Sequence, residues 1–116
     1  MLSFFNAKIW LHPEPIDFRK QIDGLVLIVT DHLKLDPVSG QIFLFRNRNR
    51  DKLKALYWEH NGFWLLYRRL EKGRFKFPKL TPPVIELSKD QLSWLLSGLN
   101  FQDYTPFKAV KVSAFC

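Results

Sequence analysis

Cysteine is almost absent from this 116-residue sequence: the only one, Cys116, is the last residue. The chain therefore cannot form an internal disulfide. One thiol and three scattered histidines (His12, His32 and His60) do not provide the ligand spacing of a zinc site. We accordingly expect no structural metal and no cofactor.

Long apolar runs are also missing. The longest one, Leu25 to Val29, is far shorter than a membrane-spanning helix requires. The N-terminus lacks the basic and apolar regions of a secretion signal. Together with the cysteine usage, these features predict a cytoplasmic protein without a membrane partner. Hydrophobic residues make up 47% of the chain, which excludes a disordered tail and suits one domain with one core.

Catalytic motifs are not found either. The sequence has no phosphate-binding loop, no glycine-rich dinucleotide fingerprint and no evident nucleophile–base pair. Its carboxylates are dispersed, whereas a metal-dependent nuclease needs carboxylates that converge on Mg²⁺. Only Asp51 and Glu71 are expected to approach each other, so a Mg²⁺-dependent nuclease is an alternative. The main expectation is a protein that is not an enzyme.

Positive charge, in contrast, is abundant and local. Between Arg46 and Lys79 the chain carries 11 of its 18 Lys and Arg residues but only three acids, Asp51, Glu59 and Glu71. This segment has an excess of eight positive charges, while the whole chain carries +7. A local excess of this kind indicates a surface for a polyanionic partner.

The same segment has the pattern of a β-meander. Asn61-Gly62, between two β-rich runs, predicts a hairpin with a tight type I′ turn. Closing the chain there pairs His60 with Phe63 and opposes Lys54 to Arg69, a like-charged pair that costs stability. Both faces of the hairpin are apolar, which predicts that it forms the centre of the sheet.

Two basic turns flank the hairpin, one at residues 46–51 and one at residues 71–74. Because alternate turns of a meander lie at the same end of the sheet, we expect them to form one phosphate-binding rim. Asn47 or Asn49 would reach base edges. The predicted phosphate contacts are Arg46, Arg48, Arg50, Lys52, Lys54, Arg68, Arg69, Lys72 and Arg74.

The aromatic residues have two interpretations. Nine of the 18 lie in the central segment, where core packing is the common role of aromatics in strands. The alternative is that they stack on unpaired bases. For that role, Phe75 and Phe77 on an expected edge strand are the best candidates.

Further elements surround the meander. We expect a strand at Ala7–His12, a helix from about Asp17 to Leu33, strands at Gln41–Phe45, Phe75–Phe77 and Val84–Leu87, and a second helix opened by a Ser88–Gln91 capping box. The predicted fold is a single α+β domain over residues 1–100, with an antiparallel four- to five-stranded β-meander sheet packed with two helices. Residues 101–116 form an aromatic tail that either packs back or docks on a partner.

The ordered motifs across Ile16 to Leu99 resemble a known family. They include Asp17-Phe18-Arg19-Lys20-Gln21-Ile22-Asp23-Gly24-Leu25, Asp36-Pro37-Val38-Ser39-Gly40, Phe43-Leu44-Phe45-Arg46-Asn47-Arg48, Tyr57-Trp58, Asn61-Gly62-Phe63 and Tyr67-Arg68-Arg69-Leu70-Glu71-Lys72-Gly73-Arg74-Phe75. In these motifs the chain resembles the TnpB-type accessory protein, product of the second reading frame, of the sixty-six family of bacterial insertion sequences.

This resemblance implies a helper in transposition that acts beside a separate transposase, which holds the catalytic acids. The partners it implies are DNA at the element ends, the transposase and the other accessory protein of the same element. With the basic segment, it favours a non-catalytic DNA-binding factor. The alternative is a module that docks on the transposase without touching DNA.

Overall fold

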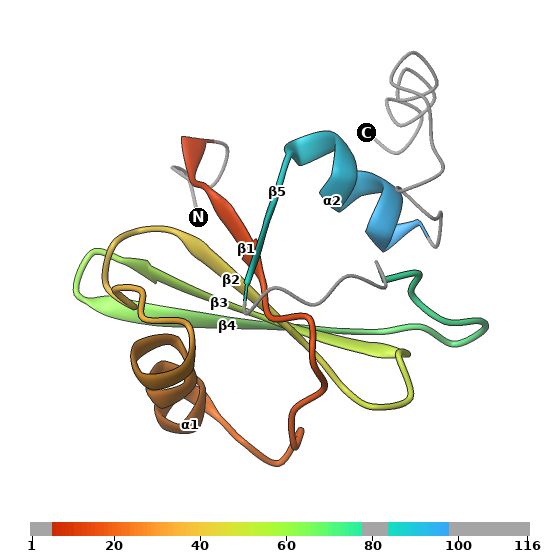
Figure 1. Ribbon diagram of the computed structural model, residues 1–116, viewed down its shortest axis with the longest axis horizontal. Helices are drawn as coiled ribbons and strands as arrows, with labels where there is room; N and C mark the ends of the chain where they lie inside the picture. Colours follow the sequence, from red (N-terminus) through yellow and green to blue (C-terminus); the bar gives the residue numbers. More distant parts are fainter. Residues whose placement is uncertain (1–5, 78–83, 98–116) are drawn as a thin grey trace.

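A computed structural model describes residues 6–77 and 84–97 as one five-stranded sheet with a helix on each face (Figure 1). The strands are β1 (Ile9–Leu11), β2 (Ile42–Arg46), β3 (Lys52–Glu59), β4 (Gly62–Arg69) and β5 (Ile85–Leu87). The helical elements are α1 (Ile22–Leu27), which continues as the π-helical turn η2 (Ile28–His32), and α2 (Lys89–Leu96). The α+β class, the five strands and the two helices are confirmed. The expected tail at residues 101–116 lies outside the described residues.

The strand order is β4-β3-β2-β1-β5, and the sheet is mixed rather than wholly antiparallel. β2, β3 and β4 form the expected antiparallel meander. β1, however, runs parallel to β2, with Ile9 opposite Ile42. The reason is that the chain between them is a long crossover that carries α1, the kind of connection that a parallel pair needs. β5 then pairs antiparallel with the other side of β1.

The hairpin between β3 and β4 closes one residue earlier than the sequence predicts. His60 and Asn61 are its two central residues, with φ of 48° and 68°, as a type I′ turn requires. Trp58 therefore pairs with Phe63, and Lys52, not Lys54, lies opposite Arg69. Because side chains alternate along a strand, this shift of two residues in pairing leaves every side chain on its predicted face.

The β3–β4 hairpin is not the centre of the sheet, so the prediction of a central hairpin is wrong. β3 is interior, but β4 has a strand partner only in β3 among the described residues. Two large side chains of β4 remain exposed as a result, Trp64 at 47% and Tyr67 at 54%. The sequence suggests a central hairpin because it is apolar on both faces. The short β1 and β5 instead extend the sheet beyond β2.

Each face of the sheet packs against one helix (Figure 1). On one face, Leu25 and Val29 of α1 and η2 pack on Phe43, Phe45 and Leu56. On the other, Trp94 and Leu95 of α2 pack on a cluster formed by Ile9, Leu11, Ile42, Leu44, Leu53, Tyr57, Phe75 and Leu87. The predicted capping box is present at the start of α2, since the side chains and backbone N–H groups of Ser88 and Gln91 bond reciprocally.

The first helix starts later than predicted, at Ile22 instead of Asp17. Asp17 diverts the backbone because its carboxylate accepts hydrogen bonds from the N–H and guanidinium of Arg19, and its carbonyl from the N–H of Lys20. Such a local side-chain bond competes with helix formation. Residues 17–20 therefore form a turn that leads into the helix.

The strand predicted at Phe75–Phe77 is wrong. Phe75 has no exposed surface and packs into the α2-side core, and its N–H donates to the carbonyl of Arg50 over 2.7 Å. Phe77 lies under the guanidinium of Arg46. Neither ring stands on an exposed strand, so these two residues do not offer the stacking surface that the sequence suggests.

Candidate nucleic-acid interface

The turn between β2 and β3 is built around the side chain of Asn47. Its Oδ1 accepts hydrogen bonds from the N–H groups of Asp51 and Lys52, both at 3.1 Å, and its Nδ2 donates to a carboxylate oxygen of Asp51 at 2.6 Å. Asn47 is thus occupied within the turn and is not available for base edges, which corrects that part of the prediction. Asn49, at the tip, is exposed.

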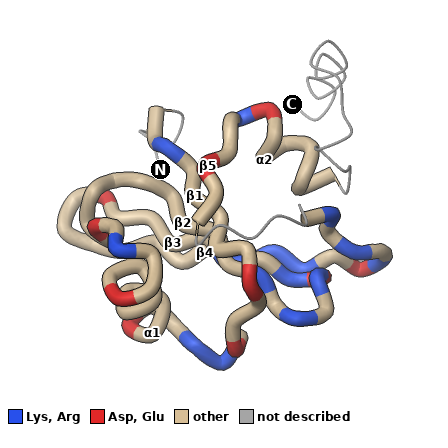
Figure 2. The backbone as a smooth tube through the Cα atoms, viewed as in Figure 1, with Lys and Arg blue, Asp and Glu red and all other residues tan. Residues whose placement is uncertain are grey.

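The turn after β4 lies directly beside it. The N–H of Leu70 donates to the carbonyl of Asp51 at 2.8 Å, and the N–H of Phe75 donates to the carbonyl of Arg50 at 2.7 Å. Gly73, with φ of 78°, allows the chain to reverse between these two bonds. The predicted convergence of the two basic turns at one end of the sheet is confirmed (Figure 2).

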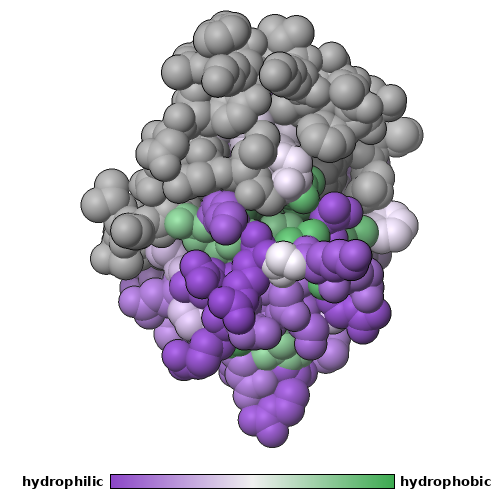
Figure 3. Space-filling view, turned by 90° about the vertical axis from the view of Figure 1, so that its right-hand side faces the viewer, coloured by the Kyte–Doolittle hydropathy of each residue, from purple (hydrophilic) through white to green (hydrophobic). Residues whose placement is uncertain are grey.

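We call the cations gathered at this end the basic rim: Arg48, Arg50, Lys52, Arg68, Arg69, Lys72 and Arg74. All are exposed except Lys52, which is half-buried. Figure 3 views the molecule from this end and shows hydrophilic residues over most of the lower half. The opposite end of the hairpin carries few Lys or Arg residues (Figure 2).

Some rim cations already have partners. Arg69 forms an ion pair with Glu71 at 2.9 Å, which raises the pKa of its guanidinium. Arg68 reaches the carbonyl of Leu96 at 3.5 Å. Within residues 6–77 and 84–97, no hydrogen bond or ion pair engages the side chains of the remaining exposed members, Arg48, Arg50, Lys72 and Arg74.

Two of the predicted phosphate contacts point inward instead. Lys54 is only 6% exposed, and its ammonium donates to the carbonyls of Phe18 at 2.9 Å and Lys20 at 2.7 Å. Arg46 donates to the carbonyl of Pro13 at 2.7 Å. Burial lowers the pKa of both groups. The correction has a physical reason, because both side chains tie the segment before α1 to the sheet. The sequence offers one signal of this burial, since Lys54 shares a strand face with Leu56, but the carbonyls that its ammonium binds are distant in the chain.

The two acids of the nuclease alternative, Asp51 and Glu71, each have a neighbour. The hydrogen bond from Asn47 lowers the pKa of Asp51, and Glu71 pairs with Arg69. Across the described part of the chain, no three His, Cys, Asp or Glu side chains come together as metal ligands. This end of the sheet therefore brings together cationic side chains and acids that are hydrogen-bonded or ion-paired.

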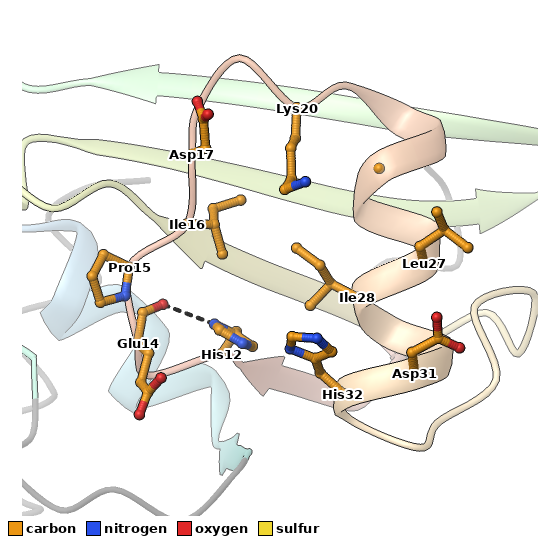
Figure 4. A pocket seen from close by; sticks show the side chains of 11 residues that line it. His12, Glu14, Pro15, Ile16, Asp17, Lys20, Leu27, Ile28, Asp31 and His32 are labelled. Atoms are coloured by element: carbon orange, nitrogen blue, oxygen red, sulfur yellow. Dashed lines mark hydrogen bonds between the residues drawn. The ribbon is translucent and has the colours of Figure 1, made fainter.

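A cavity of about 400 Å³ lies elsewhere, between the segment after β1 and the α1–η2 helix (Figure 4). Its wall contains the rings of His12 and His32, whose centroids are 6.5 Å apart, and the acids Glu14 and Asp31. Nδ1 of His12 donates to the carbonyl of Glu14 at 2.8 Å. Its mixed charge distinguishes this cavity from the basic rim.

The fold and the rim together define a small α+β protein with a cationic end on its sheet. Comparison with known proteins then places it: residues 7–106 match the model of the family described as IS66 Orf2 like protein. The chain belongs to this family, and is therefore an accessory protein of an insertion sequence.

Two relatives come from Sinorhizobium fredii (strain NBRC 101917 / NGR234). Uncharacterized protein y4jC is 36% identical over 96 residues, which cover 83% of this chain and 82% of the relative. Uncharacterized protein y4hO is 36% identical over 97 residues, 84% of each chain. No solved structure matches this chain. None of the helices in the described segments has the length and apolarity needed to cross a bilayer.

Proposed function

We propose that this chain is a non-catalytic DNA-binding factor that acts with a separate transposase. The observation that carries the proposal is the basic rim, in which two turns and the adjoining ends of β3 and β4 gather seven cations. The side chains of five of these, Arg48, Arg50, Lys52, Lys72 and Arg74, have no hydrogen-bond or ion-pair partner among the described residues. Lys and Arg at such a position bind phosphates and release counterions, which makes binding tight and salt-dependent.

The rim suits a role in positioning DNA. Its cations stand on two hydrogen-bonded turns and the adjoining strand ends, so the backbone that carries them toward a phosphate chain is already held in place. Asn49, exposed between Arg48 and Arg50, is the one amide at the tip of the β2–β3 turn. An Asn side chain can bond both polar atoms of an adenine edge, so Asn49 is the proposed source of any base preference.

The test measures binding to duplex DNA from the element ends by fluorescence anisotropy at two or more salt concentrations. The variant is Arg48→Gln/Arg74→Gln, which removes two unpartnered cations from the rim. Its matched control, Lys8→Gln/Lys34→Gln, changes the net charge equally at exposed positions outside the rim.

We expect the rim variant to bind more weakly and to lower the slope of log K against log salt by roughly two, about 0.9 for each phosphate that the variant no longer neutralises. The control should keep the wild-type slope. The proposal is wrong if the two variants bind alike, because the charge would then act without regard to its position.

A second candidate is docking on the transposase, which the exposed edge of β4 favours. Within residues 6–77 and 84–97 no strand pairs with this edge, which lies beside Trp64 and Tyr67, and a partner strand can add to a sheet at such an edge. Capture of the transposase that survives nuclease treatment would support docking. A contribution of residues 104–116 is tested by deleting them in the same assay.

A further inference from the structure

A second cavity, of about 410 Å³, adjoins the basic rim on the α1 side of the sheet. It lies between the segment that precedes α1 and the β3–β4 ribbon. Six side chains line it: Phe18, Gln21, Lys52, Lys54, Leu65 and Tyr67. Aromatic, amide and cationic groups thus meet in one recess at the edge of a surface that we propose binds DNA.

The two aromatic rings of the cavity differ in their contacts and exposure. Lys54 holds Phe18 in two ways. Its ammonium lies 5.0 Å from the centroid of the Phe18 ring and donates a hydrogen bond to the carbonyl of Phe18. Tyr67 stands opposite, with its ring centroid 6.4 Å from that of Phe18 and the two planes at 54°. More than half of Tyr67 is exposed, which leaves ring surface for a ligand.

The polar groups are arranged around these rings. Lys52 also lines the cavity, and Arg69 lies directly opposite Lys52 on the neighbouring strand. Tyr67 is in turn opposite Lys54. Gln21 contributes a side-chain amide that can both donate and accept hydrogen bonds. These groups complement a ligand that has a flat ring for the aromatic side chains, polar ring edges for the amide and a phosphate for the cations.

We propose that this cavity receives an unpaired nucleobase of the bound DNA, stacked on Tyr67, with its neighbouring phosphates on Lys52 and Arg69. The inference rests on the proposed function and specifies its substrate: DNA with a single-stranded end or gap, since a base within a duplex hides both faces. Stacking is thereby assigned to Tyr67, on the edge strand, in place of Phe75 and Phe77.

The test compares a blunt duplex with the same duplex carrying a three-nucleotide overhang, at one salt concentration. Because one base stacked on an aromatic side chain strengthens binding, we expect the overhang to bind about tenfold more tightly. Tyr67→Ala should abolish this preference without weakening blunt-duplex binding. Tyr67→Phe, which keeps the ring, should retain it. Trp64→Ala removes the exposed ring on the opposite face of β4 and should also retain it.

A second measurement uses the wild-type chain and 5-iodouracil in the overhang, whose photo-crosslink should map to Tyr67. The inference is overturned if wild type binds both DNAs equally, if Tyr67→Ala weakens both equally, or if the crosslink maps elsewhere. If Arg48→Gln/Arg74→Gln still weakens DNA binding in those cases, the proposed function stands and only this inference is lost. Absence of binding to either DNA overturns both.

Discussion

Replacing Lys54 by methionine should destabilise the fold without removing a DNA contact, although Lys54 lies in the most basic segment of the chain. Its ammonium bonds two carbonyls of the turn before α1 and lies over the ring of Phe18. Methionine has about the length of lysine and replaces its apolar stem, but it cannot donate a hydrogen bond. Lys52→Met is the matched control, on the same strand and face, where the lysine is half-buried and has no bonded side-chain partner among the described residues.

The magnitude follows from the hydrogen bonds of Lys54. A hydrogen bond to a charged group contributes about 1.5–3 kcal/mol, so the two bonds of Lys54 set an upper range of about 3–6 kcal/mol. Burial opposes this, because it disfavours the charged ammonium and lowers its pKa. The exposed turn also lets water reach the freed carbonyls. We therefore expect a loss of about 2–4 kcal/mol for Lys54→Met and a change within about 0.5 kcal/mol for Lys52→Met.

Urea unfolding at pH 7, with the slope m compared among variants, measures the stability of each protein. DNA binding is then measured under conditions in which both variants are folded. Lys54→Met should bind blunt duplex DNA like wild type, whereas Lys52→Met should bind it more weakly. A Lys54→Met protein as stable as the control, or one that is stable but defective in binding, would refute the structural role assigned to Lys54.

Three further predictions concern the turns. Asn47→Ala should cost about 1–3 kcal/mol in urea unfolding, because it removes the acceptor of two backbone N–H groups, whereas Asn49→Ala should stay within about 0.5 kcal/mol. Arg50→Gly should raise stability by about 1 kcal/mol, since Arg50 has φ of 62°, yet weaken DNA binding; a loss of stability would contradict this. Hydrogen bonds from Arg19 lower the pKa of Asp17 from 3.8 to about 2. Wild type should therefore exceed Asp17→Asn in melting temperature above pH 3.8 and lose that advantage as the pH falls through about 2.

The sequence predicts those features that depend on neighbouring residues. The Ser88–Gln91 capping box marks the start of α2 because both of its bonds are local. The two faces of β3 follow from alternation, which holds for any register. The meeting of the two basic turns follows from the order of strands in a meander. The recess beside Tyr67 has no such signal, because it forms only when the segment before α1 packs on β3 and β4.

Predictions fail where a distant contact decides the outcome. The pairing of β1 with β2 joins residues more than 30 positions apart, and nothing near Ile9 specifies it. Phe75 has the alternating pattern of a strand residue but is taken up by the core and by the carbonyl of Arg50. From the sequence, Lys54 is predicted to be an exposed phosphate contact. Its burial depends instead on carbonyls 34 and 36 residues away.

The register of the hairpin places Lys52 directly opposite Arg69. Like charges at such positions destabilise a sheet, by an amount of the order of 0.2–1 kcal/mol. Glu71 compensates only in part, because its ion pair with Arg69 is exposed. A sequence selected for stability alone would place an acid at one of the two positions. Local rules tend to be broken at functional sites. A phosphate held between Lys52 and Arg69 would turn this repulsion into attraction, so on the proposed function the cost exists only in the unbound protein.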